Sequence, residues 1–220
     1  MNITLVAKVV RFFQNRKLNP PSSQKRAREI MGRNMFGIEE AIEHFGVKPT
    51  EQQIAFFSQV PFTEATLKSC RKTHILVAVF PLSIIEIRTK VQHDLFRHHK
   101  RAWYNDKAFA NEKGIIRWHL IRKTPCKHST QKGWKEQLAF LTKHDEVPSA
   151  QVMTYTTIGY YLSAHERIFE NEYIRCRDIF DFEGNSVSVG NFDTLGFNAD
   201  YLSNRTCGGD LGLASERKKD

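Results

Sequence analysis

The stretch from Val187 to Lys218 constrains the fold of the chain most, because its two ends have the period of strands and its middle has no regular period. An apolar alternation with period two begins at Val187 and Val189 and is broken at Gly190 before Phe192, and a second one follows at Leu211 and Leu213. Such alternation predicts half-buried strands, and the glycine inside the first run predicts a bulge or a close backbone approach. The glycine-rich, polar middle predicts an ordered surface carried by these strands.

The same stretch lacks five residue types. From Gly184 to Ser215, 32 consecutive residues include no Lys, Glu, Gln, Met or Trp, whereas the next longest gap, Thr73 to Ile85, has 13 residues. None of these five types has a codon that ends in a pyrimidine. Strands and turns also disfavour Lys and Glu, so a glycine-rich surface meander is the alternative explanation.

The pattern V-x-V-G-x-F-D-x-x-G, followed by a polar and aromatic run and by L-G-L-A-S-x-R-K, resembles the variable domain of diversity-generating retroelement target proteins. In that family, adenine-directed mutagenesis of Asn codons yields residues with pyrimidine-ending codons. The resemblance is close over about thirty residues and looser over 31–174, which is similar to uncharacterised bacterial proteins with the same tail. It implies a C-type-lectin-like fold of the formylglycine-generating-enzyme type, without catalysis or a cofactor, whose hypervariable C-terminal surface binds a ligand, expected to be a protein.

A binding surface of this kind places adaptable polar residues and rigid aromatic residues on a fixed scaffold. We expect the displayed residues to be Thr194, Leu195, Phe197, Asn198, Ala199, Tyr201, Ser203, Asn204, Thr206 and Cys207. Among them, Leu195, Phe197, Tyr201, Ser203 and Thr206 are expected to be exposed on one common face.

The organisation predicted for the whole chain is α+β, with short twisted antiparallel strands and about two main helices. Residues 1–30 are basic and contain Pro-Pro-Ser-Ser, which predicts a flexible arm that is dispensable for folding. Residues 31–70 predict a helical extension that packs on the main domain. The lectin-like domain is expected over 71–220, with its variable surface at 184–215.

Local patterns place several elements. The apolar run from Thr73 to Phe80 predicts a buried central strand. Capping-box patterns at Thr50 and Ser83, each followed three residues later by Gln or Glu, predict helix starts. Helices are also expected at 130–141 and 149–163.

A basic block over 88–135 supports a different function. It interleaves Lys and Arg with all three Trp and five of the nine His, as a nucleic-acid contact would, and Lys100, Arg101 and Lys123 are its candidate phosphate contacts. The block contains no recognised nucleic-acid motif, and part of it has the pattern of a strand. Nucleic acid is therefore the alternative partner. The spacing of the histidines does not fit one helical face, so no metal site is expected.

The cysteines Cys70, Cys126, Cys176 and Cys207 lie far apart in the sequence, which predicts reduced thiols. Cys176 and Cys207 leave open a second alternative, a relative of the formylglycine-generating oxidases. No apolar run approaches the roughly 20 residues that span a bilayer, and no signal-peptide cleavage pattern follows the N-terminal apolar residues, so we expect a cytoplasmic protein.

Overall fold

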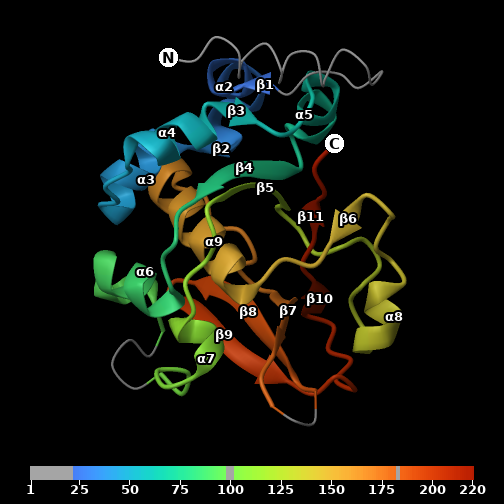
Figure 1. Cartoon of the computed structure of the whole chain (residues 1–220). Coiled ribbons are helices and arrows are strands. Elements are labelled where there is room, and N and C mark those ends of the chain that lie inside the picture. Colours follow the sequence, from blue (N-terminus) through green and yellow to red (C-terminus); the bar gives the residue numbers. More distant parts are fainter. Residues whose placement is uncertain (1–21, 98–101, 182–183) are drawn as a thin grey trace.

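The computed structural model describes residues 22–97, 102–181 and 184–220. These residues form an α+β body in which one long helix lies between two mixed sheets (Figure 1). The α-helices are α2 (Gln24–Met31), α3 (Ile38–Phe45), α4 (Glu51–Phe57), α5 (Glu64–Cys70), α6 (Ile84–Lys90), α7 (Ala108–Asn111), α8 (Trp134–Leu138) and α9 (Ala150–Ala164). The strands are β1 (Ser22–Ser23), β2 (Met35–Phe36), β3 (Gln59–Val60), β4 (His74–Val79), β5 (Arg117–Arg122), β6 (Asp145–Glu146), β7 (Tyr173–Ile179), β8 (Ser186–Asp193), β9 (Gly196–Leu202), β10 (Leu211–Leu213) and β11 (Glu216–Arg217).

The first sheet has five strands in the order β2-β4-β5-β11-β6. β4 is buried along its whole length, as the apolar run predicts, with α9 packed against it. It is an interior strand, but the middle position belongs to β5. β2 runs parallel to β4, so the prediction of purely antiparallel strands is wrong here.

The second sheet has the order β10-β7-β8-β9, with β10 parallel to β7 and the other pairs antiparallel. The C-terminal residues pass directly from this sheet to the first one. β10 pairs with β7, and after only two residues β11 pairs with β5 and β6. The tail therefore joins the two sheets.

Helix α9 begins at its predicted cap, where the Ser149 hydroxyl accepts a hydrogen bond from the Val152 amide. It packs against β2 and β4 of one sheet and against β7 and β8 of the other (Figure 1). A helix between two sheets needs no polar face, and α9 is buried all round from Ala150 to Tyr160. At Gly159 an added Cβ would lie 2.9 Å from the Phe36 ring, so this position permits the close approach of β2.

The N-terminal arm was expected to extend to residue 30, and for residues 22–30 that expectation is wrong. They form β1 and most of α2, whose Ala27 and Met31 are buried. Arg26 and Arg28 form ion pairs with Glu64 and Glu40, so part of the basic cluster is used inside the fold. The rest of the predicted arm lies outside the described residues.

Residues 31–70 are not a separate extension, because β2 is a strand of the main sheet. Both predicted capping boxes are confirmed, at Thr50 for α4 and at Ser83 for α6. The helix predicted at 130–141 is much shorter, since α8 comprises only Trp134–Leu138. Its buried residue is Gln137, whereas Trp134 is only partly buried and Leu138 is exposed.

The longest helix among the described residues is α9, with 15 residues. No helix in this part of the chain is long and apolar enough to cross a membrane.

Candidate functional site

The hairpin of β8 and β9 and the loop that follows contain the predicted binding surface. Its framework is as predicted: Val189, Phe192, Leu211 and Leu213 are buried. Gly190 has φ of 130°, and an added Cβ would lie 2.3 Å from the Glu172 carbonyl oxygen, so the expected close backbone approach is confirmed. The register shift between Gly190 and Asp193 marks the bulge.

The ten predicted surface residues divide into three groups. Thr194, Leu195, Tyr201, Ser203 and Cys207 are exposed, and Asn198, Asn204 and Thr206 are half-buried. Phe197 and Ala199 are buried, with exposed fractions of 0% and 1%, so the expectation for these two is wrong. Their side chains face the core, where the Phe197 ring packs against Phe96 and Phe192.

The exposed residues lie at opposite ends of β9. Leu195 is in the turn before β9, whereas Tyr201 and Ser203 lie at its other end. A strand of this length separates them by roughly 20 Å. The described surface is therefore concentrated in the loop 201–210, where odd-numbered residues from Tyr201 to Gly209 are exposed and the intervening ones are partly buried.

The main chain of this loop is held by groups outside it. Arg175, fully buried on β7, donates to the carbonyl oxygens of Ser203 and Thr206 at 2.7 and 2.8 Å. The Trp134 amide donates to the Asn204 carbonyl, and the Gln131 amide donates to that of Gly208. These contacts use backbone acceptors that any residue supplies. The loop's own side chains add a smaller set: Asn204 donates to the Gly184 carbonyl, and the Ser203 hydroxyl accepts from the Arg205 amide.

Arg175 is itself held by α8 and the segment before it. Its guanidinium also donates to the Gln137 side-chain oxygen at 2.9 Å and to the Lys132 carbonyl. Gln137 in turn donates to the carbonyls of Ser129 and Leu211. Burial lowers the pKa of Arg175, and no carboxylate among the described residues pairs with it, so these carbonyl and amide oxygens replace water as its acceptors.

An aromatic cluster borders the loop. Tyr201 is 44% exposed and stacks on Phe180 with ring centroids 4.4 Å apart. The Trp103 ring lies 4.9 Å from that of Tyr201, and its indole nitrogen donates to the Ala199 carbonyl. This places a rigid, half-exposed aromatic side chain next to the polar loop.

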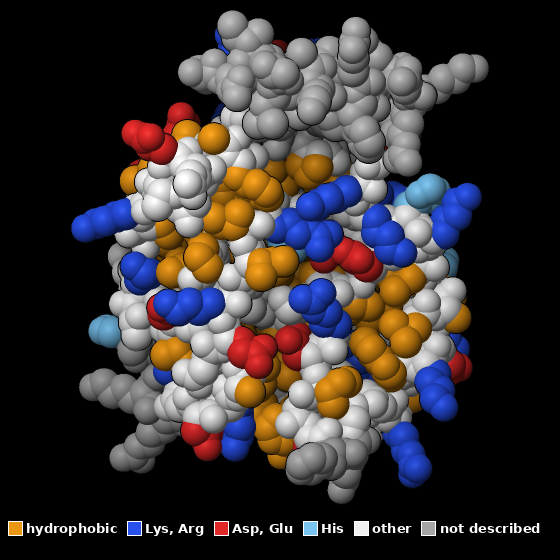
Figure 2. Space-filling view, viewed as in Figure 1, with side chains coloured by type: hydrophobic (Ala, Val, Ile, Leu, Met, Phe, Trp, Pro, Cys, Tyr) orange, Lys and Arg blue, Asp and Glu red, His pale blue; other side chains and the backbone are white. Residues whose placement is uncertain are grey.

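Of the three candidate nucleic-acid residues, Lys123 lies in the described part of the chain. Lys100 and Arg101 lie outside the described residues. The Lys123 side chain is only 17% exposed and contacts Glu166, Asn34 and Tyr160, so the expectation of a free phosphate contact there is wrong. On the face drawn in Figure 2, basic side chains are interspersed with acidic ones.

The two cysteines of the oxidase alternative differ in environment. Cys176 is fully buried in the core, where burial raises the pKa of its thiol, and Cys207 is exposed on the loop. Neither forms a disulfide. Their neighbour Arg175 faces the loop while Cys176 faces the core, so β7 separates the two thiols.

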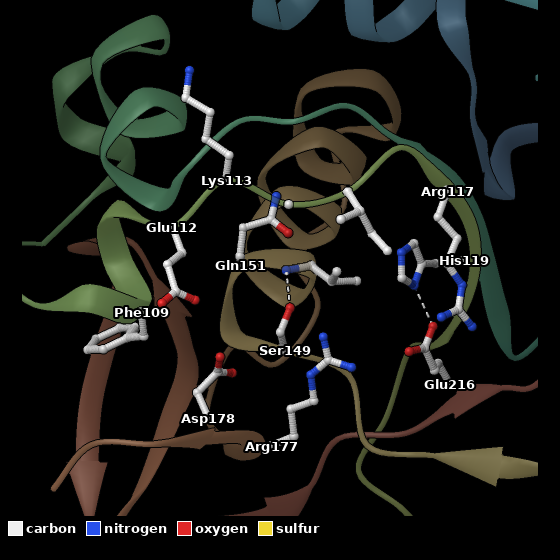
Figure 3. A pocket seen from close by; sticks show the side chains of 13 residues that line it. Phe109, Glu112, Lys113, Arg117, His119, Ser149, Gln151, Arg177, Asp178 and Glu216 are labelled. Atoms are coloured by element: carbon white, nitrogen blue, oxygen red, sulfur yellow. Dashed lines mark hydrogen bonds and ion pairs between the residues drawn. The ribbon is translucent and has the colours of Figure 1, made fainter. Parts of the chain in front are cut away.

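Sequence reasoning missed a polar pocket of ≈170 Å³ that lies at the N-terminal end of α9 (Figure 3). Five segments of the chain line it: α7 with the residues after it, β5, the start of α9, β7 and β11. The two sheets therefore meet at this pocket. Only two weak signals pointed to it: Arg177 two residues after Arg175 in a strand, and Glu216 in the tail.

His119 and Glu216 form one wall of the pocket. The His119 Nδ1 atom lies 2.5 Å from the Glu216 carboxylate, and the exposed fractions of the two side chains are 5% and 1%. The remaining polar atoms, His119 Nε2 and Glu216 Oε1, have no hydrogen-bond partner within the described part of the chain. Gln151 Oε1 has none there either, although its amide nitrogen donates to the Leu82 carbonyl.

Asp178 and Glu112 form the opposite wall. Asp178 accepts a hydrogen bond from the Ala150 amide, the first residue of α9. Burial raises the pKa of the Asp178 carboxyl; the Ala150 hydrogen bond and the Arg177 guanidinium oppose this rise, and Glu112 adds to it. Two carboxyl groups and a guanidinium therefore lie within electrostatic range of one another.

Comparisons with protein-family models, with curated proteins and with solved structures find no match for this chain.

Proposed function

We propose that this chain is a ligand-binding protein that displays a hypervariable surface on the loop 201–210, diversified by a retroelement through adenine mutagenesis. The ligand is expected to be a protein. The α+β architecture and the glycine-rich, strand-rich C-terminal end agree with the C-type-lectin-like fold that the resemblance implies.

The observation that supports this proposal most is the way in which the loop is held. Framework donors bind its main-chain carbonyls, while its odd-numbered side chains project outward. A surface that accepts many sequences needs this separation, because a loop held by its own side chains would lose its shape when they change.

The exposed residues also suit the proposed diversification. Tyr201, Ser203, Arg205, Cys207 and Gly209 all have pyrimidine-ending codons, as adenine mutagenesis of Asn codons would produce. Tyr and Arg are frequent among residues that dominate binding energy, and Ser and Gly give adaptable contacts. Tyr201 on its aromatic cluster would be the rigid anchor.

The binding capacity can be tested with two libraries of the full chain displayed on phage. One randomises positions 201, 203, 205 and 207, and the control randomises the buried framework positions 187, 189, 211 and 213. Selection against purified lysozyme as a probe should yield folded binders from the first library only. Equal yields from both libraries, or loss of folding in the loop library, would contradict the proposal.

The diversification needs a separate genetic test. The DNA around the gene should contain a reverse transcriptase gene and a near-copy of the codons for about residues 190–214, with mismatches confined to adenines. Sister isolates should differ at loop positions such as 203 and 207 and agree at the framework positions. An identical loop in all isolates, with no such copy in the genome, would contradict diversification by a retroelement.

A further inference from the structure

We propose that the pocket at the N-terminal end of α9 binds a small zwitterion of the α-amino-acid type, with its ammonium group at Glu112 and Asp178 and its carboxylate at Arg177. This inference does not depend on the display function, because the pocket shares no side chain with the loop 201–210.

The pocket is a built polar site and not a packing gap. His119, Gln151 and Glu216 line the pocket, are each at least nine-tenths buried, and each has one side-chain atom without a hydrogen-bond partner among the described residues. Leaving a buried polar atom unpaired costs about 1–3 kcal/mol. Three such atoms around one cavity indicate that a polar ligand satisfies them.

The walls carry opposite charges. Figure 3 shows the carboxyl groups of Glu112 and Asp178 on one side of the start of α9, and the Arg177 guanidinium with the His119 ring on the other. The neighbouring cations Lys113 and Arg117 already have carboxylate partners, Glu86 and Glu146. Arg177 forms no ion pair with the described residues, so its guanidinium is the group that can bind a carboxylate.

The N-terminal end of α9 also lies at this pocket. α9 has 15 residues, and its N-terminal end carries partial positive charge that favours an anion. Asp178 already occupies the Ala150 amide, which places a carboxylate there and leaves the Arg177 side for the ligand's own carboxylate.

The size of the cavity limits the ligand. An apolar cavity of roughly 150 Å³ holds one benzene molecule, so ≈170 Å³ admits about six to ten non-hydrogen atoms. Alanine and serine fall in this range.

The experiment uses the full chain labelled with ¹⁵N at histidine, titrated with L-alanine, L-serine, propionate and ethylamine. Because His119 lines the pocket, its ring resonance, assigned with a His119→Gln variant, identifies binding at this site. L-Alanine and L-serine should shift that resonance with saturation in the micromolar to millimolar range, and each singly charged analogue should bind at least about tenfold more weakly.

The variants separate the two charged walls. Arg177→Gln should weaken L-alanine binding by about tenfold or more while leaving ethylamine unaffected, and Glu112→Gln should weaken L-alanine but not propionate. Arg71→Gln, an exposed position outside the pocket, serves as the control and should change neither. Propionate binding equal to that of L-alanine would reduce the site to an anion site, and no shift of the His119 resonance with any probe would overturn the proposal.

Discussion

Arg175 links three segments of the chain through one guanidinium. It joins the strand β7 to the segment before α8 and to the loop after β9, entirely through carbonyl and amide oxygens. A shorter or apolar side chain would remove a donor from each of these acceptors, and only the Ser203 carbonyl would keep another one, the Thr206 amide. The arrangement of the display loop therefore depends on a residue about thirty positions earlier.

Replacing Arg175 tests this dependence. Arg175→Met should lower the free energy of unfolding by about 3 kcal/mol or more, because several buried acceptors lose their partner. Arg205→Met, on the exposed side of the loop, should change it by about 0.5 kcal/mol or less. Urea denaturation of both variants gives the comparison. Equal effects would show that the loop is not held by the buried guanidinium.

His74 predicts how stability depends on pH. Burial, together with the nearby Arg122 and Arg217 guanidinium groups, lowers the pKa of its imidazole from 6.5 to about 4, while Asp145 opposes the shift. In the unfolded chain His74 takes up a proton near its ordinary pKa, but in the folded chain it stays neutral. Stability should therefore fall as the pH drops from about 6.5 to 4, by up to about 3 kcal/mol, and level off below that.

The measurement is the slope of unfolding free energy against pH for the native chain and for His74→Gln. The substitution also changes the hydrogen bond between the His74 ring and the Thr73 hydroxyl, so the slopes are compared and not the absolute stabilities. Its stability should decline less steeply between pH 6.5 and 4. Parallel slopes would refute the role of His74.

At the scale of elements, the sequence predicted the features that depend on residues close together in the chain. The caps at Thr50, Ser83 and Ser149 are confirmed because each is completed within three residues. The burial of Phe197 was missed, since the glycine-rich sequence around it shows no clear period and its partner Phe96 is a hundred residues away. The pocket was missed for the same reason, because five distant segments contribute to it.

The corrected assignment of β9 gives an element-scale prediction. Phe197→Ala should lower the free energy of unfolding by about 3–5 kcal/mol through lost burial and cavity formation. Ser203→Tyr, six residues later and exposed, should change it by about 0.5 kcal/mol or less. Denaturation curves decide between core and surface. If Phe197→Ala leaves the free energy of unfolding nearly unchanged, Phe197 is displayed on the surface as first expected.

At the scale of the whole molecule, α9 and the C-terminal tail connect the two sheets. Most buried apolar residues from Ala27 to Ala214 form one continuous hydrophobic core, and Leu211 and Leu213 are buried beside it. β10 and β11 belong to different sheets although only two residues separate them. The tail therefore cannot detach from one sheet alone. The described part of the chain should therefore unfold as one cooperative unit.

The three tryptophans report on different parts of that unit. Trp118 is buried in β5 of the first sheet, Trp103 contacts β9 of the second, and Trp134 begins α8 beside the loop. In a chain labelled with 5-fluorotryptophan, urea titration followed by ¹⁹F NMR should give the same midpoint for all three signals. Leu213→Ala, in the tail, should lower all three midpoints together, with a loss of about 2–5 kcal/mol. An earlier transition at Trp103 and Trp134 than at Trp118 would mean that the second sheet unfolds independently, and that the tail does not couple the two.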